Sequence, residues 1–236
     1  MKINGATAIV TGANRGIGRA FAQHLLERGA AKVYAAARRP ETVDLPGVEP
    51  IRLDITDSEQ VRRASEIAGD VTLLVNNAGI NTFQDLVEGD LDKIRLDLET
   101  HLFGSLSMIR AFAPALAAGG GGAIVNVLSA SSWFALRGVD SYHVAKAAQW
   151  AMTNGVRLEL ADQGTLVTGL HLGLADTDLV ADIDGPKLPP SQVARAALDG
   201  VEDDRWEVLV DDWSKGVKSS LALDPRPFYE NLTLPA

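Results

Sequence analysis

Short apolar segments alternate with longer segments of helical periodicity along most of the chain. Residues 7–10 form an apolar segment with glycines on either side, which predicts a buried strand. In residues 17–28 the apolar side chains recur at helical spacing and Gly29 supplies a stop, which predicts a helix. The same patterns predict further strands at 32–37, 50–53, 71–75, 123–128, 166–172 and 207–210, and helices at about 57–68, 90–118, 140–161, 191–201 and 213–223.

This alternation predicts an α/β protein. Short strands that are apolar throughout are typical of a parallel sheet with both faces covered, and strand–helix–strand units cross over right-handedly. No repeat, linker or change in composition marks a second domain. We expect one doubly wound domain over 1–223, with a parallel sheet and helices on both faces. A proline-containing tail at 224–236 should be either mobile or folded across a pocket through Phe228 and Tyr229.

Composition narrows the class of protein. The 236 residues are 46% hydrophobic and 22% charged, which is typical of a globular protein. A formal net charge of −9 argues against nucleic acid and anionic lipid as partners. The absence of cysteine excludes disulfides and thiolate chemistry, and no other metal-binding pattern occurs. No segment resembles a signal peptide or a membrane span, so we expect a cytoplasmic protein.

Glycines cluster where the first strand should meet the first helix, in the sequence TGANRGIG at 11–18. Gly12 would allow a tight turn, Gly16 the approach of a pyrophosphate to the backbone, and Gly18 close packing of the helix on the sheet. The helix N-terminus would add unpaired N–H groups for the anion. The spacing G-x-x-x-G-x-G departs from the G-x-G-x-x-G fingerprint, and an ordinary strand-to-helix turn is the plainer alternative.

The second strand ends in Arg38 and Arg39, where an NAD-binding protein would carry an acidic residue for the ribose. A guanidinium at this place suits a 2′-phosphate, and Arg15 in the glycine loop adds a second cation nearby. The pattern therefore predicts NADP(H) in preference to NAD(H). The alternative is that these arginines are simply solvated.

Tyr142 and Lys146 lie four residues apart at the start of a predicted helix, so they share one face. A phenol is a poor acid–base catalyst at neutral pH, but a neighbouring ammonium favours the phenolate. Such a pair is common on protein surfaces. It becomes specific here because a glycine-rich loop precedes it and Ser129 stands at the end of the preceding strand.

Taken together, these segments resemble the short-chain dehydrogenase/reductase family, in its standard-length type with a Rossmann-like fold, over nearly the whole chain. The matching pieces are TGANRGIG at 11–18, Asp54, NNAG at 76–79, Ser129 and YHVAK at 142–146. The resemblance implies an oxidoreductase (EC 1.1.1.-) that interconverts a carbonyl and an alcohol by hydride transfer with a nicotinamide cofactor.

The resemblance also implies a role for each matching residue. Tyr142 would donate or accept the proton, Ser129 would bind the substrate oxygen, and Lys146 would lower the pKa of Tyr142 and hold the nicotinamide ribose. The cofactor-binding residues implied in this way are Gly12, Asn14, Arg15, Gly16, Ile17, Gly18, Arg38, Arg39, Asp54, Ile55, Asn77, Ala78, Gly79, Tyr142, Lys146, Gly173 and Thr177.

Three positions depart from the family pattern. His101 stands where the family usually has an asparagine that holds a proton-relay water; an imidazole can also pass a proton, so we hypothesise a catalytic role, against the alternative of a packing residue. Leu172 replaces the proline of a Pro-Gly turn, which leaves the spacing of Gly173 and Thr177 intact. The C-terminus also lacks the family's closing Asp-Gly pattern.

The substrate pocket should lie beyond the strand ends, at 81–83, at 130–136 and after Thr177. Trp133 and Phe134 in the second segment favour an apolar carbonyl substrate, although both could equally serve packing. Acidic residues after Thr177 would repel anionic substrates. The remaining histidines lack the company of metal ligands and are interpreted as packing or surface residues, namely His24, His143 and His171.

Two other functions are compatible with the fold. One is a catalytically impaired, redox-sensing nucleotide-binding protein; the other is an epimerase or dehydratase, which usually has a longer C-terminal domain. The presence of Ser129, Tyr142 and Lys146 together favours the enzyme. The resemblance also implies a small-molecule substrate and a homodimer or homotetramer formed through the helices near 90–118 and 140–161.

Overall fold

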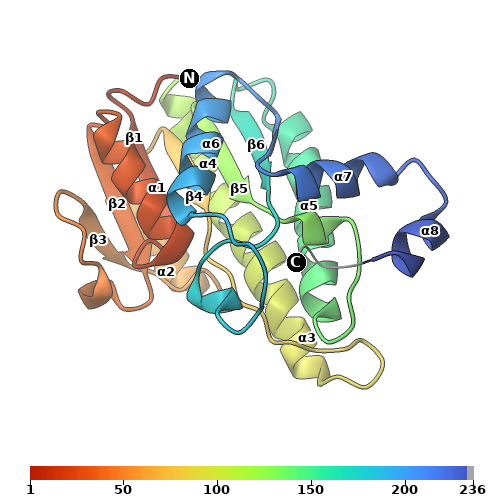
Figure 1. The fold of residues 1–236 in the computed structure, drawn as a ribbon. Coiled ribbons are helices and arrows are strands. Elements are labelled where there is room, and N and C mark those ends of the chain that lie inside the picture. Colours follow the sequence, from red (N-terminus) through yellow and green to blue (C-terminus); the bar gives the residue numbers. More distant parts are fainter. Residues whose placement is uncertain (233–236) are drawn as a thin grey trace.

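The computed structural model describes residues 1–232, which contain a seven-stranded sheet between layers of helices (Figure 1). All strands are parallel and lie in the order β3-β2-β1-β4-β5-β6-β7. The strands are β1 (Thr7–Thr11), β2 (Lys32–Ala37), β3 (Glu49–Arg52), β4 (Leu73–Asn76), β5 (Ala123–Val127), β6 (Leu166–His171) and β7 (Glu207–Leu209).

The helices follow the predicted segments closely. They are α1 (Gly16–Glu27), α2 (Ser58–Ile67), α3 (Leu91–Leu98), α4 (Ser105–Ala118), α5 (Asp140–Glu159), α6 (Pro190–Glu202), α7 (Asp212–Ser220) and α8 (Pro225–Glu230). Short 3-10 turns occur at η1 (Pro40–Thr42), η3 (Ala130–Ser132) and η4 (Asp178–Val180).

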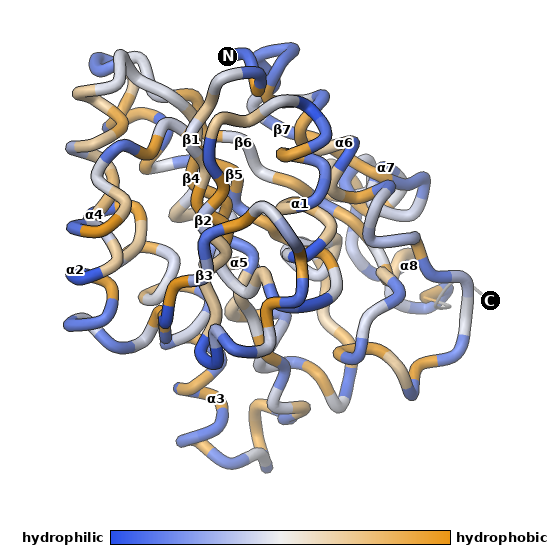
Figure 2. The backbone as a smooth tube through the Cα atoms, turned by 90° about the vertical axis from the view of Figure 1, so that its left-hand side faces the viewer, coloured by the Kyte–Doolittle hydropathy of each residue, from blue (hydrophilic) through white to orange (hydrophobic). Residues whose placement is uncertain are grey.

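The sheet has an apolar core on each face because alternate residues of its strands point to opposite sides. In β1, Ala8 and Val10 pack with Phe21 of α1 and with α6, whereas Ile9 packs with Phe112 of α4 and with α2. Figure 2 shows α2 and α4 on one side of the sheet and α1 and α6 on the other. The predicted doubly wound α/β fold is confirmed.

The order of the strands reverses between β1 and β4, since β1 is paired with both β2 and β4. In doubly wound sheets a crevice opens at this point, beyond the carboxyl ends of the strands. The glycine-rich segment after β1 and the segment after β4 therefore meet at one edge of the sheet. This edge positions the candidate site.

Two segments differ from the sequence prediction. The single helix expected at 90–118 is divided by a π-helical turn, η2 (Glu99–Gly104), between α3 and α4. The tail forms α8, and Phe228 packs on a third apolar cluster that contains Phe134 and Val217. Residues 233–236 of the expected tail lie outside the described residues. Within residues 1–232, no helix is long and apolar enough to cross a membrane.

Candidate active site

The glycine-rich turn between β1 and α1 forms a cradle of backbone atoms. Gly12 and Gly16 have φ values of +67° and +54°, a region that favours glycine. A Cβ atom on Gly18 would lie 2.1 Å from the carbonyl oxygen of Gly12, so only glycine fits there. Arg15 is the N-cap of α1 and its side chain caps no backbone group. The first N–H groups of α1 therefore have no side-chain acceptor and suit an anion.

The loop after β4 is bound to this turn by hydrogen bonds. The hydroxyl of Thr11 accepts from the backbone N–H groups of Asn77 (2.9 Å) and Ala78 (3.0 Å). The side-chain amide of Asn77 donates to the carbonyl of Thr11 at 2.8 Å. Asn77 thus fixes the position of the cradle as well as lining the cavity beside it.

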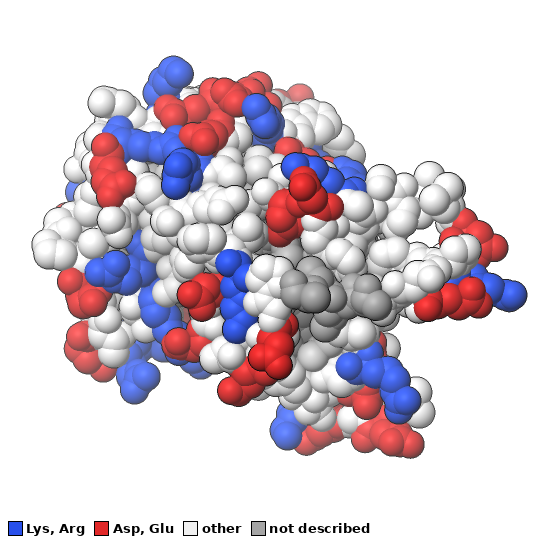
Figure 3. Space-filling view, viewed as in Figure 1, with Lys and Arg blue, Asp and Glu red and all other residues white. Residues whose placement is uncertain are grey.

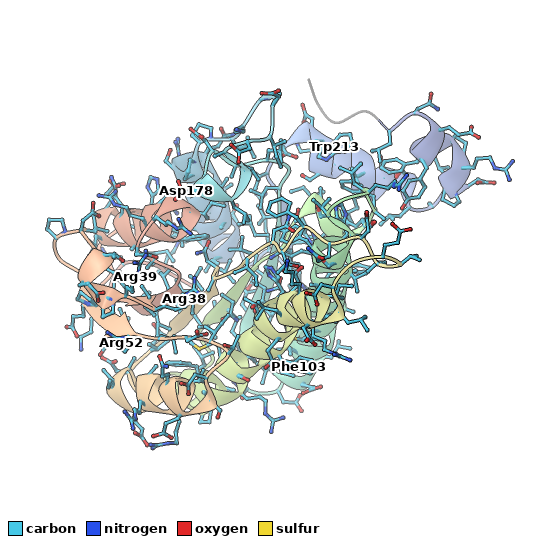
Figure 4. All side chains as sticks on the ribbon, turned by 90° about the horizontal axis from the view of Figure 1, so that it is seen from below. Arg38, Arg39, Arg52, Phe103, Asp178 and Trp213 are labelled. Atoms are coloured by element: carbon cyan, nitrogen blue, oxygen red, sulfur yellow. The ribbon has the colours of Figure 1, made fainter. Side chains whose placement is uncertain are left out.

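The ends of β2 and β3 bring three arginines to one side of the molecule, as Figure 4 shows for Arg38, Arg39 and Arg52. Arg38 lines the cavity, whereas Arg39 does not, because the chain turns there into η1 with Pro40 at its first position. Arg52, which sequence reasoning missed, donates to the carbonyl oxygen of Arg38 at 3.4 Å. Asp54 lines the cavity, and its carboxylate accepts from the backbone N–H and the hydroxyl of Thr56.

The end of β5 and the start of α5 bring Ser129, Tyr142 and Lys146 to one wall of the cavity. Ser129 is buried, and its Oγ accepts from the backbone of Ser131 at 3.1 Å. Burial raises the pKa of the Tyr142 phenol; hydrogen bonding to Ser129 opposes this rise, and the buried Asp97 carboxylate adds to it. Tyr142 is therefore protonated at neutral pH.

Lys146 is a buried cation without a carboxylate partner among the described residues. Its Nζ donates to the carbonyl oxygen of Val127 at 2.8 Å and to Oε1 of Gln149 at 3.0 Å. Nζ also lies 5.6 Å from the ring centroid of Tyr142. Burial lowers the pKa of Lys146 to about 7, because desolvation disfavours the ammonium.

His101 lies in the π-helical turn η2, a type of turn frequent at functional sites. Its ring packs edge-on against Tyr142, with centroids 5.2 Å apart, and its Nε2 is 2.7 Å from the carbonyl oxygen of Ile80. The backbone N–H of Ile80 also lies 3.4 Å from Nε2, but the shorter contact to the carbonyl oxygen favours a proton on Nε2. Nδ1 is then an acceptor, and it has no partner within residues 1–232. Burial and the nearby Lys146 charge lower the pKa of His101 well below its ordinary value.

An ion pair crosses the mouth of the cavity. Arg15 of the glycine loop and Asp178 of η4 approach to 2.5 Å, and both side chains are exposed. Thr177, directly before Asp178, lies close to the glycine loop. A Cβ atom built on Gly16 would be 3.0 Å from the Thr177 methyl group. The segment after β6 therefore reaches back over the cradle.

These elements enclose a cavity of about 470 Å³. It is lined by every residue that the sequence assigned to catalysis or cofactor binding except Gly18, which lies under the loop, and Arg39. In Figure 4, Arg38 lies toward one end of the site and Trp213 toward the other. We call these the cofactor end and the substrate end.

A second, smaller cavity of about 130 Å³ adjoins the first, since Ser129, Tyr142 and Gly173 line both. Leu179 and Val180 also line both cavities, and the other residues around the smaller one are largely apolar, including Phe134, Leu136, Val139, Leu174, Ile183 and Trp213. His143 also lines it and contacts the carbonyl oxygen of Phe134 through Nδ1. His143 is buried and bonded to the backbone, which agrees with its interpretation as a structural residue, and it also lies on the wall of this cavity.

Trp133 has a different position from its neighbour Phe134. It stacks on His171 with ring centroids 3.9 Å apart, and it lines neither of these cavities. Of the two aromatic residues predicted to face substrate, Phe134 lies at the cavity and Trp133 serves packing. Among the described residues, no group of histidines and carboxylates could hold a metal ion.

Comparison with known proteins agrees with this geometry. The profile of the short chain dehydrogenase family matches residues 6–187. An uncharacterized oxidoreductase of Staphylococcus saprophyticus is 29% identical over 214 residues, which cover 84% of this chain and 92% of the relative. A similar protein of Staphylococcus aureus strain MW2 is 30% identical, covering 81% of this chain and 88% of the relative.

Solved structures extend the comparison. A short chain dehydrogenase from Burkholderia cenocepacia in complex with NADP is 40% identical, with a TM-score of 0.93 and full coverage of both chains. A gluconate 5-dehydrogenase from the same species, in complex with NADP and tartrate, is 25% identical with a TM-score of 0.82, covering 92% of this chain and 97% of the other. The chain thus belongs to the short-chain dehydrogenase/reductase family of oxidoreductases, which act on small molecules with nicotinamide cofactors.

Proposed function

We propose that this chain is an NADP(H)-dependent oxidoreductase that interconverts an apolar ketone or aldehyde and its alcohol. The observation that carries the proposal is the meeting of Ser129, Tyr142 and Lys146 in a cavity whose other end is the glycine cradle. A protein that only senses a nucleotide has no chemical need for these three side chains together.

The cavity suits a dinucleotide along its whole length. The glycine cradle and the free N–H groups of α1 would hold the pyrophosphate, Asp54 and Ile55 would contact the adenine, and Asn77 with its neighbours would line the middle. Thr177 would meet the carboxamide. The bound nicotinamide would supply or accept the hydride at the substrate carbon.

We assign the 2′-phosphate to Arg38. Its side chain lines the cavity and makes no ion pair within residues 1–232, whereas Arg15 is already paired with Asp178. A 2′-phosphate beside Arg38 would form charge-assisted hydrogen bonds that an unphosphorylated ribose cannot form. The NADP bound to the Burkholderia relative is consistent with this assignment.

The chain's own residues would transfer the proton. Tyr142, protonated at neutral pH, would donate to the carbonyl oxygen during reduction, while Ser129 would hold that oxygen in place. In the oxidising direction the charge of Lys146 would favour the phenolate. His101 would hold a water or pass a proton behind this pair through Nδ1, with Nε2 fixed on Ile80.

The smaller cavity would hold the body of the substrate. Its volume of about 130 Å³ and its largely apolar walls fit a single ring or a short branched chain beside the Tyr142 hydroxyl. Sugar acids, the class suggested by the gluconate dehydrogenase relative, would find few polar partners there. Asp178 and the neighbouring carboxylates would further oppose anionic substrates.

The proposal includes a homodimer formed through α4 and α5. Phe103 and Val144 on the adjoining surface are 49% and 39% exposed, and Figure 4 shows Phe103 at the outside of this layer. Light scattering after size exclusion would measure the oligomer, and a monomer would contradict the dimer.

Figure 3 shows acidic and basic residues interspersed over the face in view, so this face offers no single-sign patch for a nucleic acid.

The test is turnover of a panel of cyclic ketones, short aldehydes and keto acids, followed through nicotinamide absorbance with NADPH and with NADH. We expect NADPH and apolar carbonyls to be preferred, and Tyr142→Phe to lose turnover by about 10²–10⁴-fold while still binding NADPH. A preference for keto acids would contradict the apolar pocket. Tight NADPH binding with no turnover of any carbonyl would favour the sensing protein.

A further inference from the structure

A chain of buried polar side chains leads away from Lys146 into the layer formed by α4 and α5. Oε1 of Gln149, on the next turn of α5, accepts from Lys146 Nζ at 3.0 Å. Nε2 of the same amide donates to the hydroxyl of Ser105 at 2.9 Å. Gln149 and Ser105 are each 1% exposed.

This amide is an expensive group to bury, because a side-chain amide without partners costs roughly 1–3 kcal/mol in a protein interior. A purely packing position on this face of α5 would carry an apolar residue, as Ala145 and Val156 do. Within residues 1–232, the only group bonded to the side-chain oxygen Oε1 of Gln149 is the ammonium of Lys146. The amide is therefore matched to the lysine rather than to the backbone.

The donors of Lys146 can be counted. An ammonium has three N–H groups. Val127 and Gln149 take two of them, and the lysine lines the main cavity, so one N–H remains for a group bound there. The direction of that third donor depends on both acceptors. Val127 alone would leave the ammonium free to rotate about its bond to Val127.

We propose that Gln149 is a positioning residue, which holds Lys146 so that its remaining N–H points into the cavity and which stabilises the ammonium over the neutral amine. This inference rests on the proposed function insofar as that N–H serves the cofactor ribose. Ser105 completes the arrangement because it fixes the orientation of the amide. Ser105 directly follows η2, so the same contact ties Lys146 to the turn that carries His101.

The charges around Lys146 explain why a neutral acceptor matters here. The titratable groups that face the lysine are Tyr142 from α5, His101 from η2 and His171 from β6. The buried Asp97 carboxylate of α3 faces Tyr142 and accepts hydrogen bonds from Thr82 and Ser141, not from Lys146. Tyr142 is protonated at neutral pH, and burial lowers the pKa of both His101 and His171. At neutral pH all three side chains are therefore uncharged. The ammonium is thus held by hydrogen bonds to neutral oxygens alone.

The test compares Gln149→Met with Gln149→Glu. Methionine has a similar length but no strong acceptor, so the ammonium loses a partner and the pKa of Lys146 should fall by about one unit. Glutamate adds a negative charge in the same place, so that pKa should rise by about one unit or more. The pKa is read from the lysine side-chain NMR signals of the whole protein during a pH titration, with Lys146→Met used to assign the signal.

The same opposite shifts should occur in the alkaline limb of kcat/KM and in the pH dependence of NADPH affinity measured by fluorescence. Ser105→Ala, which frees only the amide, should shift the pKa of Lys146 downward by less than Gln149→Met does. Thr153→Val is the matched control, because Thr153 is equally buried one turn further along α5, and its hydroxyl bonds to Asn126 and to the main-chain carbonyl of Gln149 but to neither Lys146 nor the Gln149 amide. It should lower stability without moving the titration.

The proposal is overturned if methionine and glutamate move the titration in the same direction, or if neither moves it. Should the glutamate variant fail to fold, the methionine and Ser105→Ala variants decide the matter, since both must shift the pKa downward. The NMR titration requires neither substrate nor cofactor. Failure of the carbonyl panel would therefore contradict the proposed function while the result for Gln149 could still be read.

Discussion

The cofactor end and the substrate end of the site are built from different parts of the chain. At the cofactor end, the wall is mostly backbone: the glycine turn, the N–H groups of α1 and the loop after β4 fixed by Thr11. At the substrate end, the wall is made of side chains such as Phe134, in the loop after η3, and Trp213 of α7. A backbone wall tolerates few changes, whereas a side-chain wall can change its shape one residue at a time. We expect substitutions at the two ends to have different consequences.

The sharpest form of this comparison is the same substitution made in the cradle and in α7, the helix that carries Trp213. Gly18→Ala places a Cβ atom 2.1 Å from the carbonyl oxygen of Gly12, so the cradle must distort. We expect NADPH affinity to fall by about 100-fold or more and stability by about 3 kcal/mol, as for other overpacked sites. Gly216→Ala in α7 meets no atom within 4 Å and should stabilise the protein by up to about 1 kcal/mol. Calorimetry and fluorescence titration measure both, and equal losses would contradict the comparison.

The second prediction concerns acid stability in the packed core beside the site, where His171 of β6 lines neither cavity. Burial of His171, stacked on Trp133, lowers its pKa to about 4. In the unfolded chain, the imidazole of His171 therefore binds a proton as the pH falls below about 6.5, whereas in the folded protein it stays neutral until about pH 4. Stability should be lost between about pH 6.5 and 4, by about 3 kcal/mol from this residue. Urea unfolding across this range measures how steeply the free energy of unfolding depends on pH. This dependence should become weaker in His171→Gln. If it is unchanged in that variant, the loss of stability comes from other groups.

A smaller effect is expected where α8 supports the wall. Phe228 packs on Phe134 with ring centroids 6.0 Å apart, so Phe228→Ala should loosen the substrate cavity without touching the cradle. KM for a cyclic ketone should rise about 10-fold, equivalent to about 1.4 kcal/mol, with NADPH affinity unchanged. Leu223→Ala, in the same segment but 70% exposed, is the control. A matching loss of NADPH affinity in Phe228→Ala would show that the two ends are not independent.

The smallest effect should come from the ion pair between Arg15 and Asp178 at the mouth of the main cavity. Asp178 competes with an anionic cofactor for Arg15, but both side chains are exposed and such pairs contribute only about 0–1 kcal/mol. Asp178→Asn should therefore tighten NADPH binding up to about five-fold. Asp182→Asn removes a charge from the same segment without breaking a pair, and should change affinity less. Weaker NADPH binding in Asp178→Asn would mean that the ion pair orders the mouth rather than blocking it.

The difference between the ends also explains what the sequence could predict. The cradle, the strand ends and the pair Tyr142 and Lys146 are encoded by residues close together in sequence, and nearly all of them line one cavity as expected. Arg39 was misplaced because Pro40 starts η1 there, which a strand-end pattern does not reveal.

Contacts between distant segments escaped prediction. Gln149 touches Ser105, 44 positions away, and Phe134 meets Phe228 from the far end of the chain. The sequence did contain one usable signal for Gln149: a polar amide on the buried face of a helix, one turn after the lysine. The π-helical turn left no such signal in the sequence. In a long α-helix the apolar positions rotate gradually around the axis, and one extra residue shifts them in a similar way, so the apolar pattern does not reveal it.

That turn also limits which changes the helix can accept. Its bonds span five residues instead of four, so deleting one residue within 99–104 would restore α-helical bonding. Relative to α4, helix α3 would then rotate by about 100° about the helix axis and move by about 1.5 Å along it. Asp97, which holds Thr82 and Ser141 by hydrogen bonds of 2.6 Å, would be carried away from both. The extra residue of the π-helical turn thus fixes the rotation of α3 about its axis relative to α5. An insertion or deletion in this region would change that rotation.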